Sequence, residues 1–559
     1  MIFCMRGYFK TFILLTFMLA PTVYSQIELV PVNHKVYTFL NSLHKRGIII
    51  GYNNANLPFS REIVAEYIQI INAHRNWLSS TEENLLNDLA IEFSYDLNHN
   101  LSNSHSLLIS TDEILYPGSS PQKYLYAFTD SAATLFVDGL LWGSQRNYGM
   151  SEYKSNLSLG EYGFRIRGTV YQDIGFYLKL SSGQAFAGGR DTRVIATNYD
   201  PRLRKTYKFL DEKYFENFEG YLRYRLKPGA YLTFGREGVT LGTGYLDKLL
   251  ISNNAAPFDY GKFDLGYKAV NYSFLYGNLR GDSMGVQIDS KNIIAHRLDL
   301  TLSDYFKIGI YEAVVNSNQH LNFTYLNPVS FLFSADLSTE KDNNSNSMIG
   351  LDVEIIPYRN TGVQFSFLID DFDFRYIDSN EPQSNNNKFA WQLGVFNSQP
   401  FLIKDLDISA EYTRLDPFVY SHKSNKSHFT HWNYSLGHSL PPNSDEIACK
   451  IDYNFSARLR SNIKFRYQRS GEGITYDGLG NIQKNFGSDI WNSDGIYLKK
   501  VKFLEGNRVN RQIIAMNLIW EPVRQFFVDL NYSGIFTDFI GSGKTSADHL
   551  FFITLSIDY

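Results

Sequence analysis

The chain has 559 residues, enough for one very large domain or several of ordinary size. Aromatic residues make up 16%, charged residues make up 20%, and the formal net charge is -4. No apolar run approaches the roughly 18 residues that a membrane-spanning helix requires. A helical membrane protein is therefore excluded. No basic block suited to nucleic acid is present, so we expect no nucleic-acid partner.

The first residues have the pattern of a secretory signal peptide. Arg6 and Lys10 precede an apolar segment over residues 11–20, and small residues near Ser25 suit a cleavage site. We therefore expect residues 1–25 to be a signal peptide and the mature chain to enter the cell envelope.

Residues 26–97 have the spacing of short amphipathic helices. The apolar stripes are Val36, Phe39, Leu40 and Leu43; Ile63, Val64, Tyr67, Ile68 and Ile71; and Leu85, Leu86, Leu89 and Phe93. Ser60 is expected to cap the second helix, and Ser80 with Glu83 fits a capping box before the third. We predict a periplasmic helical bundle over 26–97, with export machinery as a candidate partner, and a linker over 98–123.

From residue 124 onward the pattern is that of strands joined by turns. Polar and apolar residues alternate, and the polar positions include Arg165, Arg167, Arg223 and Arg225. Arginines in the middle of an apolar strand require that one face of the sheet be wet. The two faces are therefore expected to meet different solvents.

Residues 551–559 are typical of a closing strand. Phe551, Ile553, Leu555, Ile557 and Tyr559 are apolar at every second position, and the chain ends on the aromatic residue. An apolar outer face and a mostly polar inner face suit the last strand of an outer-membrane barrel, where an open edge would be a liability.

Short turns alternate with long polar stretches over residues 124–559, a pattern that is typical of transmembrane barrels. Counting both kinds of connection gives about 18 antiparallel strands. We therefore predict an all-β transmembrane barrel with a small N-terminal α-helical bundle, in contact with the lipid of a bacterial outer membrane. A soluble, β-rich secreted protein of two domains is the structural alternative.

Several polar stretches are expected to meet at the outer mouth of this barrel, if the short turns face the periplasm. Their candidate polysaccharide-binding residues are Arg236, Asn253, Asn254, Tyr325, Asn327, Asp370, Asp371, Trp432 and His438. Aromatic faces pack against sugar rings, and planar polar side chains bind paired hydroxyls or acidic groups. For Arg236 the alternative is an ion pair with a lumen carboxylate such as Asp370 or Glu237.

The order and spacing of these stretches resemble a known family. They are Phe234-Gly235-Arg236, Gly242 with Gly244, Ser252-Asn253-Asn254 leading to Pro257-Phe258, Asn327-Pro328, Asp370-Asp371 and Leu436-Gly437-His438. This set resembles the capsule assembly (Wzi-like) outer-membrane proteins. The resemblance implies a barrel of about 18 strands, a periplasmic helical bundle and a lectin-like role in holding surface polysaccharide.

Our hypothesis is a barrel that binds and organises capsular or exported polysaccharide at the cell surface, without catalysis, cofactor or metal. A general porin or transporter is the main alternative. A barrel hydrolase could use Asp370, Asp371 and His438 to activate water. Adjacent carboxylates on a strand point to opposite faces, however, so we expect only one of the two aspartates to serve a given pocket.

Overall fold

The computed structural model describes residues 26–108, 121–204, 207–280, 290–317, 323–332, 345–377, 379–424 and 426–559. The signal peptide expected over residues 1–25 lies outside this range. None of the helices in these residues has both the length and the apolar character needed to span a bilayer.

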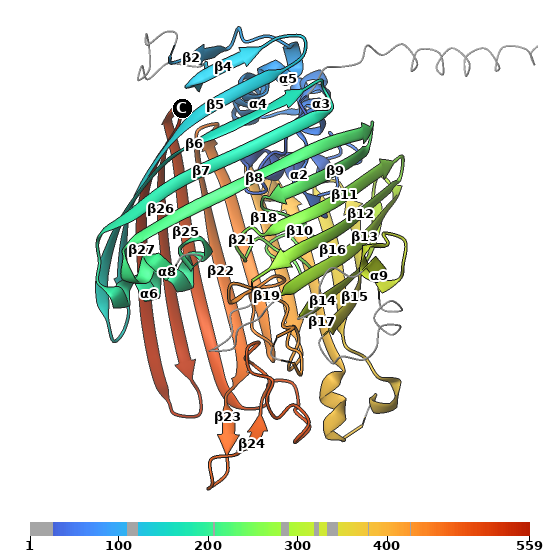
Figure 1. Cartoon of the computed structure of the whole chain (residues 1–559), viewed down its shortest axis with the longest axis vertical. Coiled ribbons are helices and arrows are strands. Elements are labelled where there is room, and N and C mark those ends of the chain that lie inside the picture. Colours follow the sequence, from blue (N-terminus) through green and yellow to red (C-terminus); the bar gives the residue numbers. More distant parts are fainter. Residues whose placement is uncertain are drawn as a thin grey trace, which may run out of the picture.

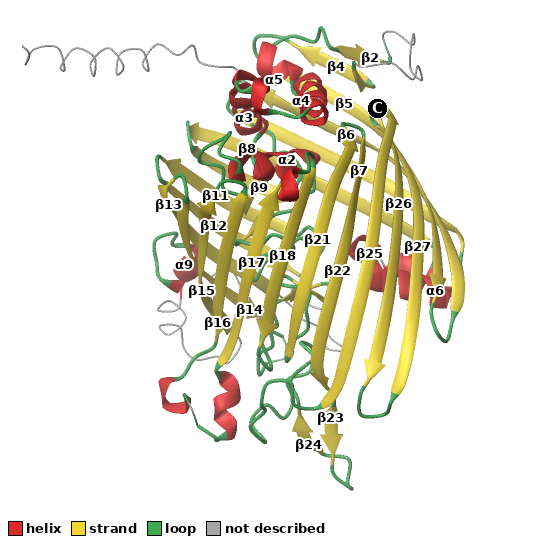
Figure 2. Ribbon diagram, turned by 180° about the vertical axis from the view of Figure 1, so that it is seen from behind, coloured by secondary structure: helices red, strands yellow, loops and turns green. Residues whose placement is uncertain are grey.

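Helices occupy one end of the molecule, at the top of Figures 1 and 2, which we call the helical end. They are α2 (Lys35–Lys45), α3 (Arg61–Ala73), α4 (Ser80–Glu92) and α5 (Ser94–Asn98), with the 3-10 turn η1 (Arg75–Trp77). Their apolar faces share one core, which includes Val36, Leu40, Leu43, Val64, Ile68, Leu86, Leu89 and Phe93. The predicted amphipathic stripes therefore pack against one another.

The capping box of α4 lies one residue earlier than predicted. The Ser79 hydroxyl accepts from the Glu82 amide at 3.0 Å, and the Ser79 amide donates to the Glu82 carboxylate at 2.8 Å. Ser79 is the N-cap because the helix begins at Ser80, so the third helical residue is Glu82 and not Glu83. Ser60 occupies the N-cap position of α3 as predicted, but its hydroxyl donates to the Glu62 side chain at 3.3 Å and makes no capping hydrogen bond.

Within the described residues, eighteen antiparallel strands close into a barrel, in agreement with the predicted fold. They are β5 (Thr134–Gly149), β6 (Lys154–Val170), β7 (Ile174–Ala187), β8 (Tyr214–Lys227), β9 (Ala230–Arg236), β11 (Asp259–Tyr267), β12 (Val270–Leu279), β13 (Lys291–Ser303), β14 (Phe306–Ser317), β15 (Ser345–Tyr358), β16 (Thr361–Asp370), β17 (Lys388–Ser398), β18 (Leu406–Leu415), β21 (Ser444–Ser456), β22 (Leu459–Glu472), β25 (Asn507–Val523), β26 (Phe526–Phe539) and β27 (Lys544–Asp558).

The C-terminal strand closes the barrel, as predicted. Strand β27 pairs with β5 from Leu140 to Gly149, and the Tyr559 amide donates to the Gly139 carbonyl at 2.9 Å. Because its two sides pair with β26 and β5, this strand has no open edge.

Short strands accompany the barrel. Strands β2 (Ser104–Ser106), β3 (Gln122–Tyr124) and β4 (Tyr126–Thr129) lie at the helical end, and β1 (Asn56–Leu57) pairs with β10 (Thr240–Leu241). Strands β19 (Thr430–His431) and β20 (Tyr434–Ser435) form one hairpin, and β23 (Ile474–Tyr476) and β24 (Ile482–Asn485) form another. The β23–β24 hairpin projects from the end opposite the helices, which we call the loop end (Figure 1).

The predicted arginines face the interior. Arg165 lies 2.7 Å from Asp138 and 3.6 Å from Asp558, and Arg223 lies 3.7 Å from Asp264. Arg167 donates to the Gln26 side chain at 3.1 Å, and Arg225 pairs with Glu62 of α3 at 2.8 Å. These contacts confirm the prediction that one face of the sheet is polar and lines the barrel interior.

The outer wall is apolar. Leu222 and Phe234 on adjacent strands are 60% and 61% exposed. Exposed tyrosines mark the hairpins at the helical end: Tyr171, Tyr267, Tyr305 and Tyr358. An apolar band bordered by aromatic side chains is what contact with a bilayer requires.

Candidate functional site

Loops that were expected at the outer mouth fold into the barrel instead. Residues from 239–258 and 419–440 form a buried core with the inner wall of β12–β18; it includes Leu241, Leu249, Leu250, Leu275, Ile293, Leu368, Tyr420, Phe429 and Leu436. Helices α6 (Arg190–Tyr199), α7 (Pro201–Arg204) and α8 (Tyr207–Asp211) pack inward against β5–β8 through Ala196, Leu203 and Phe209. The Tyr434 hydroxyl donates to the Thr197 carbonyl, which joins the two inserts. Apolar residues in these loops therefore draw them into the lumen.

Asp247 is the hydrogen-bonding centre of the inward loops. Its carboxylate accepts from the Asn254 amide at 3.1 Å, from the backbone of Ser439 at 2.9 Å and from the Ser252 hydroxyl. Because the carboxylate is buried, these hydrogen bonds replace the water contacts that it would otherwise make. Asp247 was not among the residues predicted from the sequence, although a carboxylate within an apolar loop could have indicated it.

His438 lies beside this centre, 3.9 Å from Asp247. The Leu440 amide donates to Nδ1 at 3.0 Å, and burial lowers the pKa of the histidine, so the imidazole is neutral with its proton on Nε2. The backbone of His438 also donates to the Tyr420 hydroxyl at 3.2 Å. Asn254 and His438 are therefore brought together, as predicted, but in the interior.

Asp370 and Asp371 both contact one cation, contrary to the expectation from strand geometry. Lys388 lies 3.4 Å from Asp370 and 3.0 Å from Asp371. Strand β16 ends at Asp370, and Asp371 has a φ of 60°, so the strand alternation no longer holds there. The Tyr420 amide donates to Asp370, which links this group to the loop of His438. Among the described residues, no group of three His, Cys, Asp or Glu side chains could hold a metal ion.

Arg236 lies on the outer wall of the barrel. Its guanidinium forms a bidentate pair with Asp259, with Nε at 3.0 Å, and lies 5.6 Å from the centre of the outward-facing Phe218 ring. The alternative partners suggested by the sequence, Asp370 and Glu237, are not the partners in the structure. The side chains of Arg236 and Asp259 are 30% and 54% exposed.

Tyr325 and Asn327 also lie on the outside. Tyr325 lies in the short helix α9 (Phe323–Leu326) and is buried against Ile294 and Val314. The residues next to Ile294 and Val314 in sequence face the lumen, so these two side chains face outward. The Tyr272 hydroxyl donates to the Pro328 carbonyl, next to the exposed Asn327. These two residues are thus separate from the interior group around Asp247.

Trp432 forms the turn between β19 and β20. Trp432 and Asn433 have φ values of 50° and 65°, the left-handed conformation that a two-residue hairpin turn needs. Asn253 lies elsewhere, exposed at the edge of a 620 Å³ interior cavity that Glu219, Glu237 and Arg460 also line. The nine predicted residues therefore divide between the interior and the outer wall.

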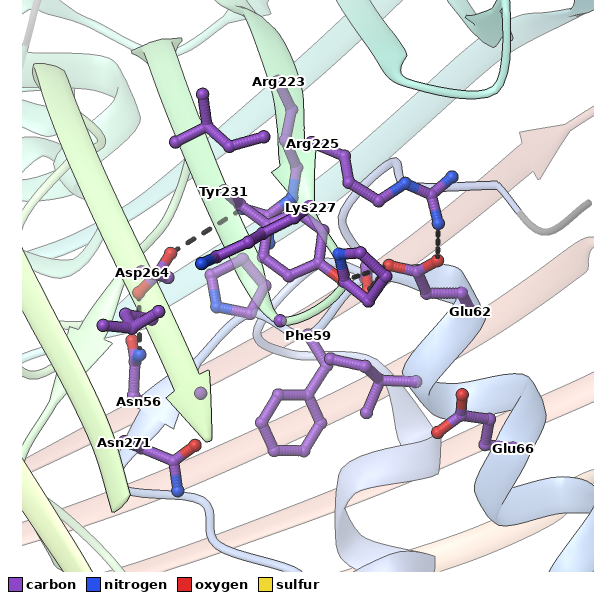
Figure 3. Close-up of a pocket in the computed structure, with 18 of the residues that line it drawn as sticks. Asn56, Phe59, Glu62, Glu66, Arg223, Arg225, Lys227, Tyr231, Asp264 and Asn271 are labelled. Carbon is purple, nitrogen blue, oxygen red and sulfur yellow. Dashed lines mark hydrogen bonds and ion pairs between the residues drawn. The ribbon is translucent and has the colours of Figure 1, made fainter. Parts of the chain in front are cut away.

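A larger cavity of 1230 Å³ lies where the helices meet the barrel wall. Figure 3 shows Phe59 between Glu66 on one side and Asn271 on the other. Arg225 of β8 reaches Glu62 of α3, and Asn56 donates to Asp264 at 2.9 Å. An ion pair from α3 and a hydrogen bond from β1 therefore attach this end of the chain to the barrel wall.

Among the described residues, two long loops, over residues 371–377 with 379–387 and over residues 473–506, form exposed surface at the loop end. Asn385 joins them: its side chain donates to the Lys499 carbonyl at 2.7 Å and accepts from the Val501 amide at 2.9 Å. Asn443 holds the second loop, because its amide donates to the carbonyls of Gly471 and Glu505, both at 2.8 Å. These buried asparagines were not predicted from the sequence.

Aromatic side chains stand out from these two loops. Phe374, Tyr476 and Tyr497 are 80%, 57% and 41% exposed. Lys499 and Lys502 are exposed near Tyr497 in sequence. Exposed rings and exposed cations on the same loops are suited to binding sugar rings and acidic groups.

Comparison with known proteins gives one family. The family model described as "Capsule assembly protein Wzi" matches residues 147–491. A search of curated proteins gave no match. The fold is similar to that of Wzi from Escherichia coli, described as an outer membrane protein involved in group 1 capsule assembly and a carbohydrate-binding β-barrel. Identity to it is 13%, coverage is 95% of this chain and 99% of that chain, and the TM-score is 0.56.

Two further solved structures are similar at lower TM-scores. The outer membrane protein opdK of Pseudomonas aeruginosa is 9% identical over 77% of this chain and 99% of its own, with a TM-score of 0.45. A BenF-like porin of Pseudomonas fluorescens Pf-5 is 10% identical over 76% of this chain and 99% of its own, with a TM-score of 0.45.

The closed barrel and its apolar outer wall place the protein in the bacterial outer membrane. The family model spans more than half of the sequence, and its range includes the inward loops, Arg236 and the Asp370–Asp371 pair. The chain belongs to the Wzi family of capsule assembly proteins.

Proposed function

We propose that the protein binds capsular or exported polysaccharide at the cell surface and holds it there without turnover. Under this proposal the loop end faces outward and the helical end faces the periplasm, where export machinery is a candidate partner of the helices. The family and the carbohydrate binding described for the E. coli protein support this assignment.

The observation that carries the proposal is the aromatic surface of the loop end. Tyr476 and Tyr497 belong to one loop, and Phe374 belongs to the loop that Asn385 joins to it. Because buried asparagines hold both loops, the rings are positioned before a ligand arrives, which lowers the entropic cost of binding. Asn254, Asp370 and His438 would contribute indirectly, by fixing the inward loops beneath this surface.

A porin is the second candidate, and the interior disfavours it. The inward loops form an apolar core inside one side of the barrel, and α6–α8 pack into the other. A diffusion pore needs a continuous water-filled path, whereas these inserts are packed like a protein core.

The proposal is tested on cells with the double variant Tyr476→Ala/Tyr497→Ala. Both rings lie on the surface, at 57% and 41% exposed, so their removal should leave insertion unchanged. We expect loss of two stacking faces, at about 1 kcal/mol each, to release most of the cell-bound polysaccharide into the medium. Cell-bound and released polysaccharide are measured by immunoblot.

The matched control is Tyr358→Ala, which removes a still more exposed tyrosine at the helical end. It should retain polysaccharide like the wild type. Equal retention by the double variant and the wild type would count against the loop surface as the binding site.

A further inference from the structure

A cavity inside the barrel has the size of a ligand site. It is the 620 Å³ cavity beside Asn253, which we call the central chamber. Arg61 and Glu92 line it from the helices, Arg202 lines it from α7, and Asn253 lines it from one of the inward loops. Cavities that bind organic ligands in proteins measure about 300–1,000 Å³. The central chamber therefore has room for a ligand of several rings.

Some buried polar atoms that line the central chamber lack partners. Among the described residues, the Glu237 Oε2 and Asp138 Oδ1 atoms accept no hydrogen bond, and the Arg524 Nε atom donates none. All three residues are more than nine-tenths buried. Buried polar atoms in folded proteins nearly always have a hydrogen-bond partner. These two acceptors and one donor therefore require partners from outside the chain.

Arg460 adds a cation to the same chamber. It lines the chamber from β22, is partly exposed, and forms no hydrogen bond or ion pair with any residue that the structure describes. Other arginines of the chamber, such as Arg165 and Arg202, have carboxylate partners. In the order of the strands, β22 lies across the barrel from β9, which Glu237 follows. Within the described chain, the chamber thus has an unpaired cation on one side and an unpaired carboxylate oxygen on the other.

The wall next to Arg460 is polar. A second cavity of 200 Å³ shares Arg460 and Lys35 with the central chamber, and Asn462 and Asn517 also line it. The Asn462 amide donates to Asn517 at 3.1 Å, and the Asn517 amide donates to Asn531 at 2.9 Å. Each of these amides can both donate and accept, as sugar hydroxyls do. The wall is therefore suited to a ligand that carries many hydroxyl groups.

The inner faces of β22 and β25 lead from the loop end to the chamber. No residue of these two strands belongs to the apolar cores that the described inserts form with the wall. Toward the loop end these faces carry Arg466 and Arg511, whose side chains are 25% and 27% exposed. At the helical end α2 packs against the wall, where Lys35 lies 3.3 Å from Glu521. A ligand therefore reaches the chamber from the loop end.

We infer that the central chamber binds a short acidic oligosaccharide. The carboxylate of the sugar accepts from Arg460 and from the Arg524 Nε atom, while sugar hydroxyls donate to Glu237 and Asp138. A small anion such as sulfate supplies acceptors for the cations but no donor for Glu237. An extended saccharide carries both kinds of group along its length and reaches both sides of the chamber. This site is separate from the loop-end surface and does not depend on polysaccharide binding there.

The test measures binding of tetragalacturonic acid to the detergent-solubilised mature protein by isothermal titration calorimetry. We expect saturable binding to the wild type, and about tenfold weaker binding of the neutral, carboxyl-reduced tetramer, because charge-assisted hydrogen bonds are lost. Arg460→Gln should weaken binding of the acidic tetramer about tenfold, and Arg460→Lys should weaken it less. Both variants should fold like the wild type, because Arg460 has no partner in the described chain. Sulfate at equal ionic strength should not displace the tetramer.

Arg469→Gln is the matched control, because Arg469 lies on the same strand but faces outward, beside the exposed Ile463 and Phe465 on that face. It should bind the tetramer like the wild type. Tyr476→Ala/Tyr497→Ala should also bind it like the wild type, so that failure of the loop-end proposal is measured separately. Absence of saturable binding, equal affinity of Arg460→Gln and wild type, equal affinity of the acidic and neutral tetramers, displacement by sulfate, or loss of binding in the loop-end variant would overturn the inference.

Discussion

Asp247 shows how a single buried carboxylate can organise two loops that are distant in sequence. It accepts from Ser252 and Asn254 in its own loop and from Ser439 in the other. The Tyr420 hydroxyl, which donates to the Leu249 carbonyl at 2.7 Å, provides a second link between them. The position of the inward loops therefore depends on a few buried polar groups.

Replacing Asp247 with Ala should loosen both loops without preventing barrel assembly. The partly buried donors of Ser252 and Ser439 would lose their acceptor, while Asn254 would keep only the Gly437 carbonyl, at about 1–3 kcal/mol for each group that stays unsatisfied. Hydrogen exchange of segments 248–254 and 436–440 should become faster by on the order of a hundredfold. Glu152→Ala, an exposed carboxylate in the turn after β5, should leave the exchange unchanged. Unchanged protection in Asp247→Ala would contradict this role.

At the scale of elements, buried ion pairs attach the helices to the barrel. Asp88 of α4 lies 2.6 Å from Arg524 and 3.0 Å from Arg458, both in turns between strands. Lys45 of α2 pairs with Glu354 of β15, and Lys307 of β14 lies 3.0 Å from the same carboxylate. The helices are thus docked on the wall at several separate points.

Asp88→Asn should release α4 from this docking. Breaking a buried pair by removing one partner costs roughly 3–5 kcal/mol, because the remaining charges are left uncompensated. Limited proteolysis should cut residues 80–98 faster, while heat-modifiable migration in gels shows that the barrel is intact. The control on the same helix is Glu83→Gln, whose pair with Arg75 is exposed. The docking account fails if both variants resist proteolysis equally.

For the whole molecule, local sequence patterns predicted the barrel well. Alternation placed Arg165 and Arg223 inside, and the terminal aromatic of residues 551–559 indicated the closing strand. Both features could be predicted because side chains alternate between the two faces of a strand, and this two-residue period can be recognised within a few residues of sequence. The same argument predicted the helices, with the cap of α4 misplaced by one residue because two serines are adjacent.

The candidate site was less predictable, because it depends on contacts between distant segments. Turn counting placed the loops at one rim, but it gives no information on whether a loop folds inward. Asn254 meets the Gly437 carbonyl only because an apolar core forms inside the barrel. The outward position of Arg236 follows from strand parity, while its partner Asp259 follows from the register of β9 and β11.

The most direct test of the central claim is a binding measurement with the detergent-solubilised wild-type protein and the host's own surface polysaccharide. Saturable binding is expected at the loop end. Tyr476→Ala/Tyr497→Ala should weaken it at least tenfold, since two stacking contacts of about 1 kcal/mol each are lost. Absence of saturable binding to the wild-type protein would contradict the account.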